Sequence, residues 1–68
     1  MAISARNCIP GKVVKVKEGM VTAEVVLDIG GGKEIVSVIT LESAKRLGLR
    51  EGEEADAVIK ATEVMIQK

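Results

Sequence analysis

Polar side chains able to bind an anion gather near the start of the chain, in residues 3–7 (Ile-Ser-Ala-Arg-Asn). The guanidinium of Arg6 offers a rigid fork of N–H donors that suits a tetrahedral oxyanion, and the hydroxyl of Ser4 adds another donor. The other cluster of this kind is residues 60–62 (Lys-Ala-Thr), near the far end of the chain. We therefore expect the fold to bring the two clusters together around an anion.

Arg6 and Lys60 also have an ordinary interpretation, as surface charges paired with carboxylates, which is the usual role of such residues. Against it, Lys60 follows Val58 and Ile59 and precedes Ala61, at an otherwise apolar strand end. Spacing alone leaves both interpretations open.

The remaining residues that can do chemistry have structural explanations. The three glycines at 30–32 lack the Lys-Ser/Thr of a P-loop and open no helix, so they indicate a hairpin turn. The chain has no His to activate Cys8, which we expect to be a small core residue, with Met20 and Met65 filling gaps in the core. The carboxylates form no acid–base pair, and we expect no enzymatic activity.

The length and composition predict one small domain, residues 1–68, in which only about 60% of the unfolded surface can be buried. The sequence is 47% hydrophobic but has no Phe, Tyr or Trp, so the core must be aliphatic. A domain this small usually needs a disulfide, a metal or partner subunits. One Cys excludes an internal disulfide, and the lack of His argues against structural zinc. A homo-oligomer is the prediction that remains.

The charge balance and the termini limit the partners. Ten basic and ten acidic residues give a formal net charge of zero, and no aromatic ring is present on which bases could stack, which disfavours nucleic acid. No apolar run approaches membrane-spanning length, and the N-terminus lacks the pattern of a secretory leader. A lone thiol suits a reducing compartment. We expect a cytoplasmic protein with no membrane or nucleic-acid partner.

Strand patterns dominate the chain. Residues 20–29 give the clearest one, because every odd position from 21 to 29 is apolar and the other face is more polar. Residues 34–40 return after the glycine turn and are apolar on both faces, which suggests that another subunit covers the outer face. Strands are also predicted over residues 9–17 and 54–61, with short strands over residues 2–7 and 64–66.

One helix is predicted, over residues 40–48. Thr40 is placed as its N-cap and Gly48 as its C-terminal stop. Leu41, Ala44 and Leu47 share one side of this helix, which should cover one end of the sheet. About five short strands and one short helix, which follows the third long strand, predict an all-β fold: a small closed barrel like the oligonucleotide/oligosaccharide-binding (OB) barrels.

Residues 3–7, followed by Gly-Lys-Val-Val at 11–14, resemble the opening of the molbindins, the small molybdenum-pterin-binding or Mop proteins. The likeness covers essentially the whole chain. The same module also resembles the molybdate-binding domains of the molybdate-responsive repressor and of the molybdate importer's ATPase subunit. Here the module is present as a single copy. The likeness continues through residues 23–32, 39–43, 47–49 and 60–66.

The resemblance implies an OB-like barrel that assembles as a trimer of dimers, a hexamer, with an N-terminal strand exchanged between subunits. It also implies molybdate or tungstate held at the subunit interfaces, for intracellular molybdenum storage or homeostasis. Carried over by motif, Ser4 and Arg6 hold the oxyanion, Lys60 and Ala61 lie beside them, and Thr40 reaches in from the neighbouring subunit.

The chain departs from the family pattern at a few positions near these residues. Cys8 and Pro10 stand where Gln and Lys are common, which bears on strand pairing at the interface and leaves the implied ligands intact. A Ser is common beside the late Lys. Ala61 offers only its backbone amide there, with Thr62 as a substitute hydroxyl.

The physical chemistry favours an intact oxyanion as the ligand. With no His and one Cys, the chain has no set of soft ligands for a bare molybdenum ion, and it would bind the dianion by hydrogen bonds. The residues do not separate molybdate from tungstate or decide whether a pterin is bound. Two alternatives stay open: an assembly module in which Ser4 and Arg6 only hold an interface together, and an OB barrel that binds nucleic acid.

Overall fold

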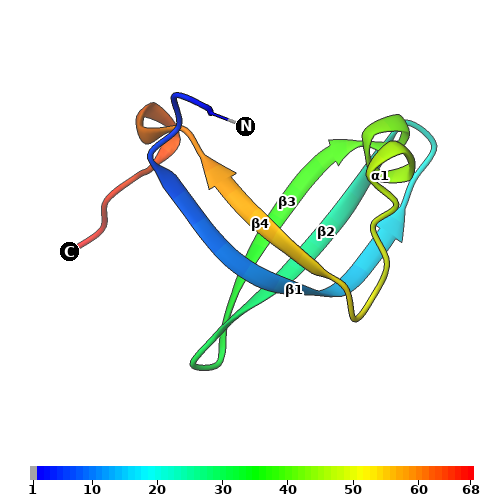
Figure 1. Cartoon of the computed structure of the whole chain (residues 1–68), viewed down its shortest axis with the longest axis horizontal. Coiled ribbons are helices and arrows are strands. Elements are labelled where there is room, and N and C mark those ends of the chain that lie inside the picture. The colour runs from blue at the N-terminus through cyan, green and yellow to red at the C-terminus, as the bar shows by residue number, and fades with distance from the viewer. Residues whose placement is uncertain (1) are drawn as a thin grey trace.

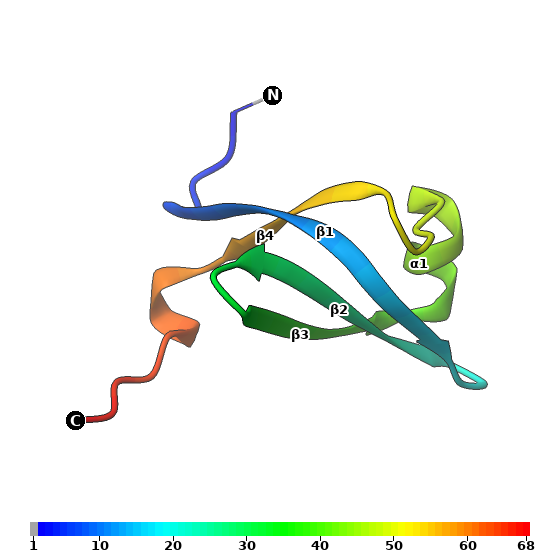
Figure 2. The ribbon, with the colours of Figure 1, turned by 90° about the horizontal axis from the view of Figure 1, so that it is seen from below.

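Four antiparallel strands form one curled sheet in the computed structural model, which describes residues 2–68 (Figure 1). The strands lie in the order β3-β2-β1-β4, so β3 and β4 are the two edges of a half-barrel (Figure 2). The elements are β1 (Asn7–Glu18), β2 (Thr22–Gly30), β3 (Lys33–Thr40), α1 (Leu41–Leu47), β4 (Glu54–Ile59) and the 3-10 turn η1 (Ala61–Glu63).

The long strand β1 joins the two parts of the sheet. Its first half pairs with β4 and its second half with β2, and a bulge between Val13 and Lys15 interrupts the register with β2. A bulge bends its strand and increases the twist, which helps the sheet to curl. Gly11 allows a close approach to β2, because a Cβ atom there would lie 3.1 Å from the backbone oxygen of Asp28.

The core lies on the concave face of the sheet. Its centre is formed by Val13, Val25, Leu27 and Ala57, which come from β1, β2 and β4. The buried face predicted for the second strand is confirmed for Ala23, Val25 and Leu27, but Val26, on the opposite face, is buried as well. This core is small and aliphatic, as the composition requires.

The edge strand β3 is apolar on both faces, as predicted. Ile35 and Ile39 are half-buried and pack against the core, whereas Val36 and Val38 are exposed on the opposite face. The single chain leaves that outer face uncovered. Its covering by another subunit stays a prediction.

The helix α1 has both predicted caps. The hydroxyl of Thr40 accepts a hydrogen bond from the backbone N of Ser43 at 3.1 Å, and Gly48 takes the left-handed conformation, with φ of 65°. Ala44 is buried, but Leu47 is exposed, so the predicted apolar side of the helix contacts the sheet only in part. Among residues 2–68, no helix has the length and hydropathy needed to cross a membrane.

Both predicted terminal strands are absent from the described chain. Residues 2–6 are irregular, residues 64–68 have no strand partner, and β4 ends at Ile59 because Ala61 begins η1. A short strand needs a neighbouring strand to pair with, and neither terminal segment lies beside one. Since β3 and β4 do not pair, the barrel is half-open, and the prediction of a closed barrel is wrong for the single chain. The mostly β, OB-like fold with one short helix is confirmed.

Three residues expected in the core are exposed instead. Met20 is 96% exposed in the turn between β1 and β2, and Met65 lies in the exposed segment after η1. Cys8 is exposed beside β4, where its Sγ lies 3.9 Å from Oδ2 of Asp56. Cys8 alternates with Ile9, which packs against the core, so the strand register rather than residue size decides its exposure.

Candidate functional site

The register between β1 and β4 brings the two polar clusters to one end of the sheet. Asn7 opens β1 and lies opposite Ile59, which closes β4. Arg6 therefore directly precedes this cross-strand pair, and Lys60 directly follows it. Both ribbon views show the N-terminal segment and η1 leaving the sheet at this end, which we call the site end (Figure 1; Figure 2).

The side chain of Asn7 links the two chain segments that carry the clusters. Its Nδ2 donates a hydrogen bond to the backbone oxygen of Ile59 at 3.1 Å, and the pair is partly buried. This bond joins residues 52 positions apart and fixes the backbone immediately before Lys60. Sequence reasoning included Asn7 in the motif but assigned it no role. The sequence signal for a role of Asn7 was its carboxamide, which stands where an apolar strand begins.

The turn η1 presents the second cluster in a compact form. The N–H of Glu63 donates to the oxygen of Lys60 at 2.8 Å, and the N–H of Val64 donates to the oxygen of Ala61 at 3.3 Å. The first N–H groups of a helical turn have no partner within the turn, so the amides of Ala61 and Thr62 are suited to receive an anion. Residues 60–62 are all exposed.

Neither cation at the site end has a carboxylate partner among residues 2–68, as holds for most Lys and Arg side chains of this chain. Across residues 2–68, the ion pair that the structure forms is Lys15 with Glu24, at 3.6 Å, and it involves neither Arg6 nor Lys60. Ser4 and Arg6 are exposed as well. The site end thus offers a guanidinium, an ammonium and hydroxyl donors to the solvent, without an activated nucleophile or a general base. Such a set can bind an anion but has no group to transform it.

Thr40 lies at the other end of the sheet. It pairs with Thr22 where β2 begins, beside the end of β1 that is opposite to Asn7. Its hydroxyl caps α1 and also donates to Oγ of Ser43 at 2.8 Å. One chain therefore does not bring Thr40 to Arg6. A contact between Thr40 and an anion at the site end would have to come from another copy, which stays a prediction.

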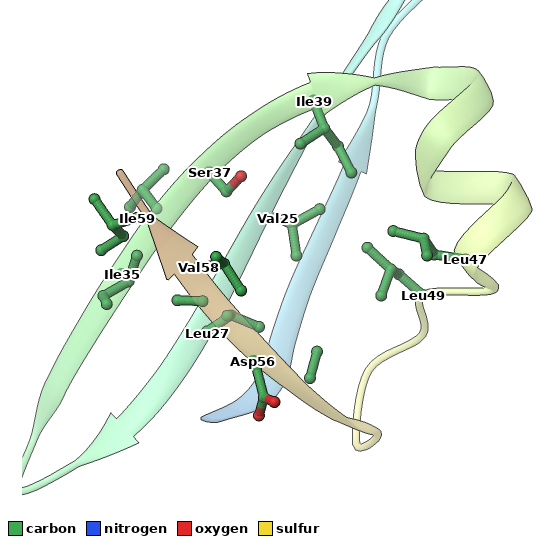
Figure 3. A pocket seen from close by; sticks show the side chains of 13 residues that line it. Val25, Leu27, Ile35, Ser37, Ile39, Leu47, Leu49, Asp56, Val58 and Ile59 are labelled. Atoms are coloured by element: carbon green, nitrogen blue, oxygen red, sulfur yellow. The ribbon is translucent and has the colours of Figure 1, made fainter. Parts of the chain in front are cut away.

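A separate apolar groove lies between the edge strands β3 and β4 and encloses about 450 Å³ (Figure 3). We call it the β3–β4 groove. Its polar side chains are Ser37 and Asp56, so it is unsuited to a small dianion. Within the described residues, no group of three or more Cys, Asp or Glu side chains is placed to hold a metal ion. Apolar side chains from three strands line the groove, among them Val25, Leu27, Ile35, Ile39, Ala57 and Ile59.

Comparison with known sequences finds similarity over almost the whole chain. Residues 3–66 match the TOBE domain. The chain is 61% identical over 66 residues to molybdenum-pterin-binding protein 3 of Clostridium pasteurianum, and the alignment covers 97% of both proteins. The similarity therefore concerns the complete relative and not one domain of a larger protein.

Comparison with solved structures finds the same half-barrel. MopII from Clostridium pasteurianum, in an apo form, superposes with a TM-score of 0.92 at 57% sequence identity, over 98% of this chain and 100% of that one. A molybdate-binding protein from Sporomusa ovata superposes with a TM-score of 0.94 at 38% identity, over the full length of both chains. The coverage of 98% and 100% means that the compared regions include nearly all of both terminal segments.

Proposed function

This chain belongs to the TOBE-domain family and to its molybdenum-pterin-binding (Mop) proteins, and from this premise we propose that it binds molybdate or tungstate as an intact oxyanion. The family is one of molybdate-binding modules rather than enzymes. The chain would act likewise, holding the oxyanion without changing it.

The observation that carries the proposal is the meeting of Arg6 and Lys60 at the site end. The pairing of Asn7 with Ile59 brings their backbones together, and no carboxylate among the described residues pairs with either cation. Two cations and neighbouring hydroxyl and amide donors complement a tetrahedral dianion, because charge-assisted hydrogen bonds are the strongest available to such a ligand. Arg6 provides the planar fork and Lys60 a mobile point charge.

Three of the remaining proposed ligands lie at the site end of the same chain, and one comes from another copy. Ser4 contributes its hydroxyl, Ala61 its backbone amide, and Thr62 its hydroxyl or amide. Thr40 approaches from a neighbouring copy, because within its own chain it lies at the opposite end of the sheet. The proposed site is thus shared between subunits.

An interface site agrees with the exposure of the proposed ligands. Ser4, Arg6, Lys60 and Thr62 are all exposed in the single chain, where water weakens every charge interaction. A second copy that covers the site would lower the local dielectric and strengthen the same hydrogen bonds. We propose that the protein forms a homo-oligomer, namely a hexamer built as a trimer of dimers. This assembly stores or buffers molybdenum in the cytoplasm.

The oxyanion is a better candidate than a pterin for this chain. The sequence contains no aromatic residue, so no ring can stack on a pterin. The donors at the site end match oxygen atoms, and the groove that could take a flat organic ligand is lined mainly by aliphatic side chains. The binding experiment described next therefore includes a free pterin as a separate ligand.

Titration calorimetry of the purified protein with molybdate, tungstate, sulfate and a free pterin tests this function. We expect heat with the first two anions and little with sulfate or the pterin. Equal binding of all three anions would indicate a generic anion site and would exclude a dedicated molybdenum store. If none of the anions gives heat, on protein shown to be assembled, the interpretation of the chain as an assembly module is the one that remains.

A further inference from the structure

A carboxylate belongs to the turn that carries half of the proposed oxyanion site. Glu63 closes η1, three residues after Lys60 and next to Thr62. Its backbone N–H donates to the oxygen of Lys60 at 2.8 Å, so the turn holds the two residues close together. The first and fourth residues of such a tight turn have Cα atoms less than about 7 Å apart. A negative charge is therefore built into a cluster whose other polar groups attract an anion.

No cation neutralises this carboxylate among residues 2–68. Glu63 is exposed, and the ion pair that this part of the chain forms, Lys15 with Glu24, does not involve it. The side chain of Glu63 also takes part in none of the side-chain hydrogen bonds of these residues. Its charge is therefore free to act on an anion that binds at the site end.

The carboxylate changes the charge that the site end offers to a dianion. Arg6 and Lys60 carry two positive charges, which match the two negative charges of molybdate, but Glu63 subtracts one of them. Because Lys60 and Thr62 are proposed ligands, the bound anion would lie within roughly one Debye length of the carboxylate, about 8 Å at physiological ionic strength. Like charges at this distance repel, and the repulsion grows where a second copy lowers the local dielectric.

We propose that Glu63 is the affinity-limiting residue of the oxyanion site. Its carboxylate repels the bound dianion and so keeps the binding of molybdate reversible. This inference rests on the proposed function, because a protein that buffers an anion also has to release it. The repulsion scales with the charge of the ligand, so Glu63 disfavours a dianion about twice as strongly in free energy as a monoanion of the same shape.

The ordinary explanation for Glu63 is that it stabilises η1. An acidic side chain in the first turn of a helix interacts favourably with the N-terminal end of the helix dipole. The two explanations predict opposite results for Glu63→Gln. If Glu63 only stabilises the turn, loss of its charge loosens residues 60–62 and weakens molybdate binding. If Glu63 limits the affinity, the same substitution strengthens binding.

Titration calorimetry with molybdate, on assembled wild-type protein and on Glu63→Gln, tests the proposal. We expect the variant to bind molybdate about three- to tenfold more tightly than the wild type at low salt. The difference should shrink as NaCl is raised from about 0.05 to 0.5 M, because salt screens the repulsion. Glu63→Asp keeps the charge and should bind within about twofold of the wild type.

Glu54→Gln is the matched control for Glu63→Gln. It removes the same charge from an exposed residue at the opposite end of β4, roughly 17 Å along the strand from Ile59. This separation is about two Debye lengths at physiological ionic strength, so we expect the molybdate affinity of Glu54→Gln to equal that of the wild type.

Weaker or unchanged molybdate binding in Glu63→Gln would overturn the proposal. An equal gain in Glu54→Gln would overturn it as well, because the anion would then respond to net charge alone, and so would a gain that salt does not alter. If wild-type protein gives no heat with molybdate, the proposed function fails and this inference fails with it. Wild-type binding without a gain in Glu63→Gln would overturn this inference alone.

Discussion

At the α1 end of the sheet, the Thr40 hydroxyl and the Gly48 amide both bond to their own chain, whereas at the site end neither Arg6 nor Lys60 has a carboxylate partner among residues 2–68. The helix end is complete in one copy. The site end has a fixed backbone, held by Asn7, but unsatisfied side chains. The caps at the helix end contribute to stability, and we propose that the exposed donors at the site end contribute to binding.

The largest effect expected from this comparison is the loss of anion affinity in Arg6→Ala. A hydrogen bond to a charged group contributes about 1.5–3 kcal/mol, so molybdate should bind about 10- to 100-fold more weakly. Wild-type protein at a hundredfold excess of molybdate over Kd should gain about 2.7 kcal/mol in unfolding free energy. At the same molybdate concentration the variant should gain only about 0.4–1.4 kcal/mol, so the rise in Tm that molybdate causes should fall by about half or more.

Arg46→Ala is the matched control for Arg6, because it removes the same exposed side chain from the last turn of α1. Calorimetry and thermal melts with molybdate should show wild-type affinity in this variant. An unchanged molybdate shift in Arg6→Ala would remove Arg6 from the proposed site. An equal loss in both variants would mean that overall charge, and not the site end, attracts the anion.

A second prediction concerns Thr40, which lies at the helix end of its own chain and which we propose reaches the site end of a neighbouring copy. Asn and Asp are both good N-caps, so Thr40→Asn and Thr40→Asp should change the unfolding free energy little. Thr40→Ala should lower it by about 1 kcal/mol. If Thr40 faces the anion of another copy, Thr40→Asp should weaken molybdate binding several-fold more than Thr40→Asn, because its charge repels the dianion.

Chemical denaturation and calorimetry of these three Thr40 variants separate the two roles. Equal molybdate affinity in Thr40→Asp and Thr40→Asn would confine Thr40 to capping α1. The proposed site would then be built from Ser4, Arg6 and residues 60–62 without it.

A third prediction tests the bond that organises the site end. Asn7→Ala leaves the partly buried oxygen of Ile59 without its side-chain donor, which should cost about 1 kcal/mol in unfolding free energy. Molybdate affinity should fall several-fold as well, because the backbone before Lys60 becomes less fixed. Urea denaturation and titration calorimetry measure the two effects. A loss of stability with full affinity would show that Asn7 supports the sheet but does not position Lys60.

The elements that one chain completes were predictable from local signals. The alternation along β2 and the caps of α1 at Thr40 and Gly48 involve neighbouring residues, so the sequence contains their physical cause. The predicted meeting of the two clusters rested on the cationic and hydroxyl donors that both clusters carry. The bond of Asn7 to Ile59 was not predictable, because residues this far apart meet only through the register.

The predictions that were wrong concern segments that a single chain leaves unpaired and apolar side chains that it leaves exposed. Residues 2–6 and 64–66 were predicted in strands, but a strand requires a neighbour, and the single chain provides none at those positions. Met20 and Met65 are apolar and were therefore expected in the core, yet a turn and a tail hold them outside it. Composition records that a residue prefers burial, but not whether its own chain or a partner buries it.

The smallest predicted effect on molybdate binding comes from a substitution at the helix end. Gly48 has φ of 65°, where a Cβ atom is strained although no other atom is near, so Gly48→Ala should lower the unfolding free energy by about 1 kcal/mol. Gly48→Asn should recover part of this loss, because Asn tolerates the left-handed conformation. Thermal melts with and without molybdate should show a lower Tm and an unchanged molybdate shift. A reduced shift in Gly48→Ala would contradict this expectation and would mean that strain at the C-terminal end of α1 weakens binding of the anion.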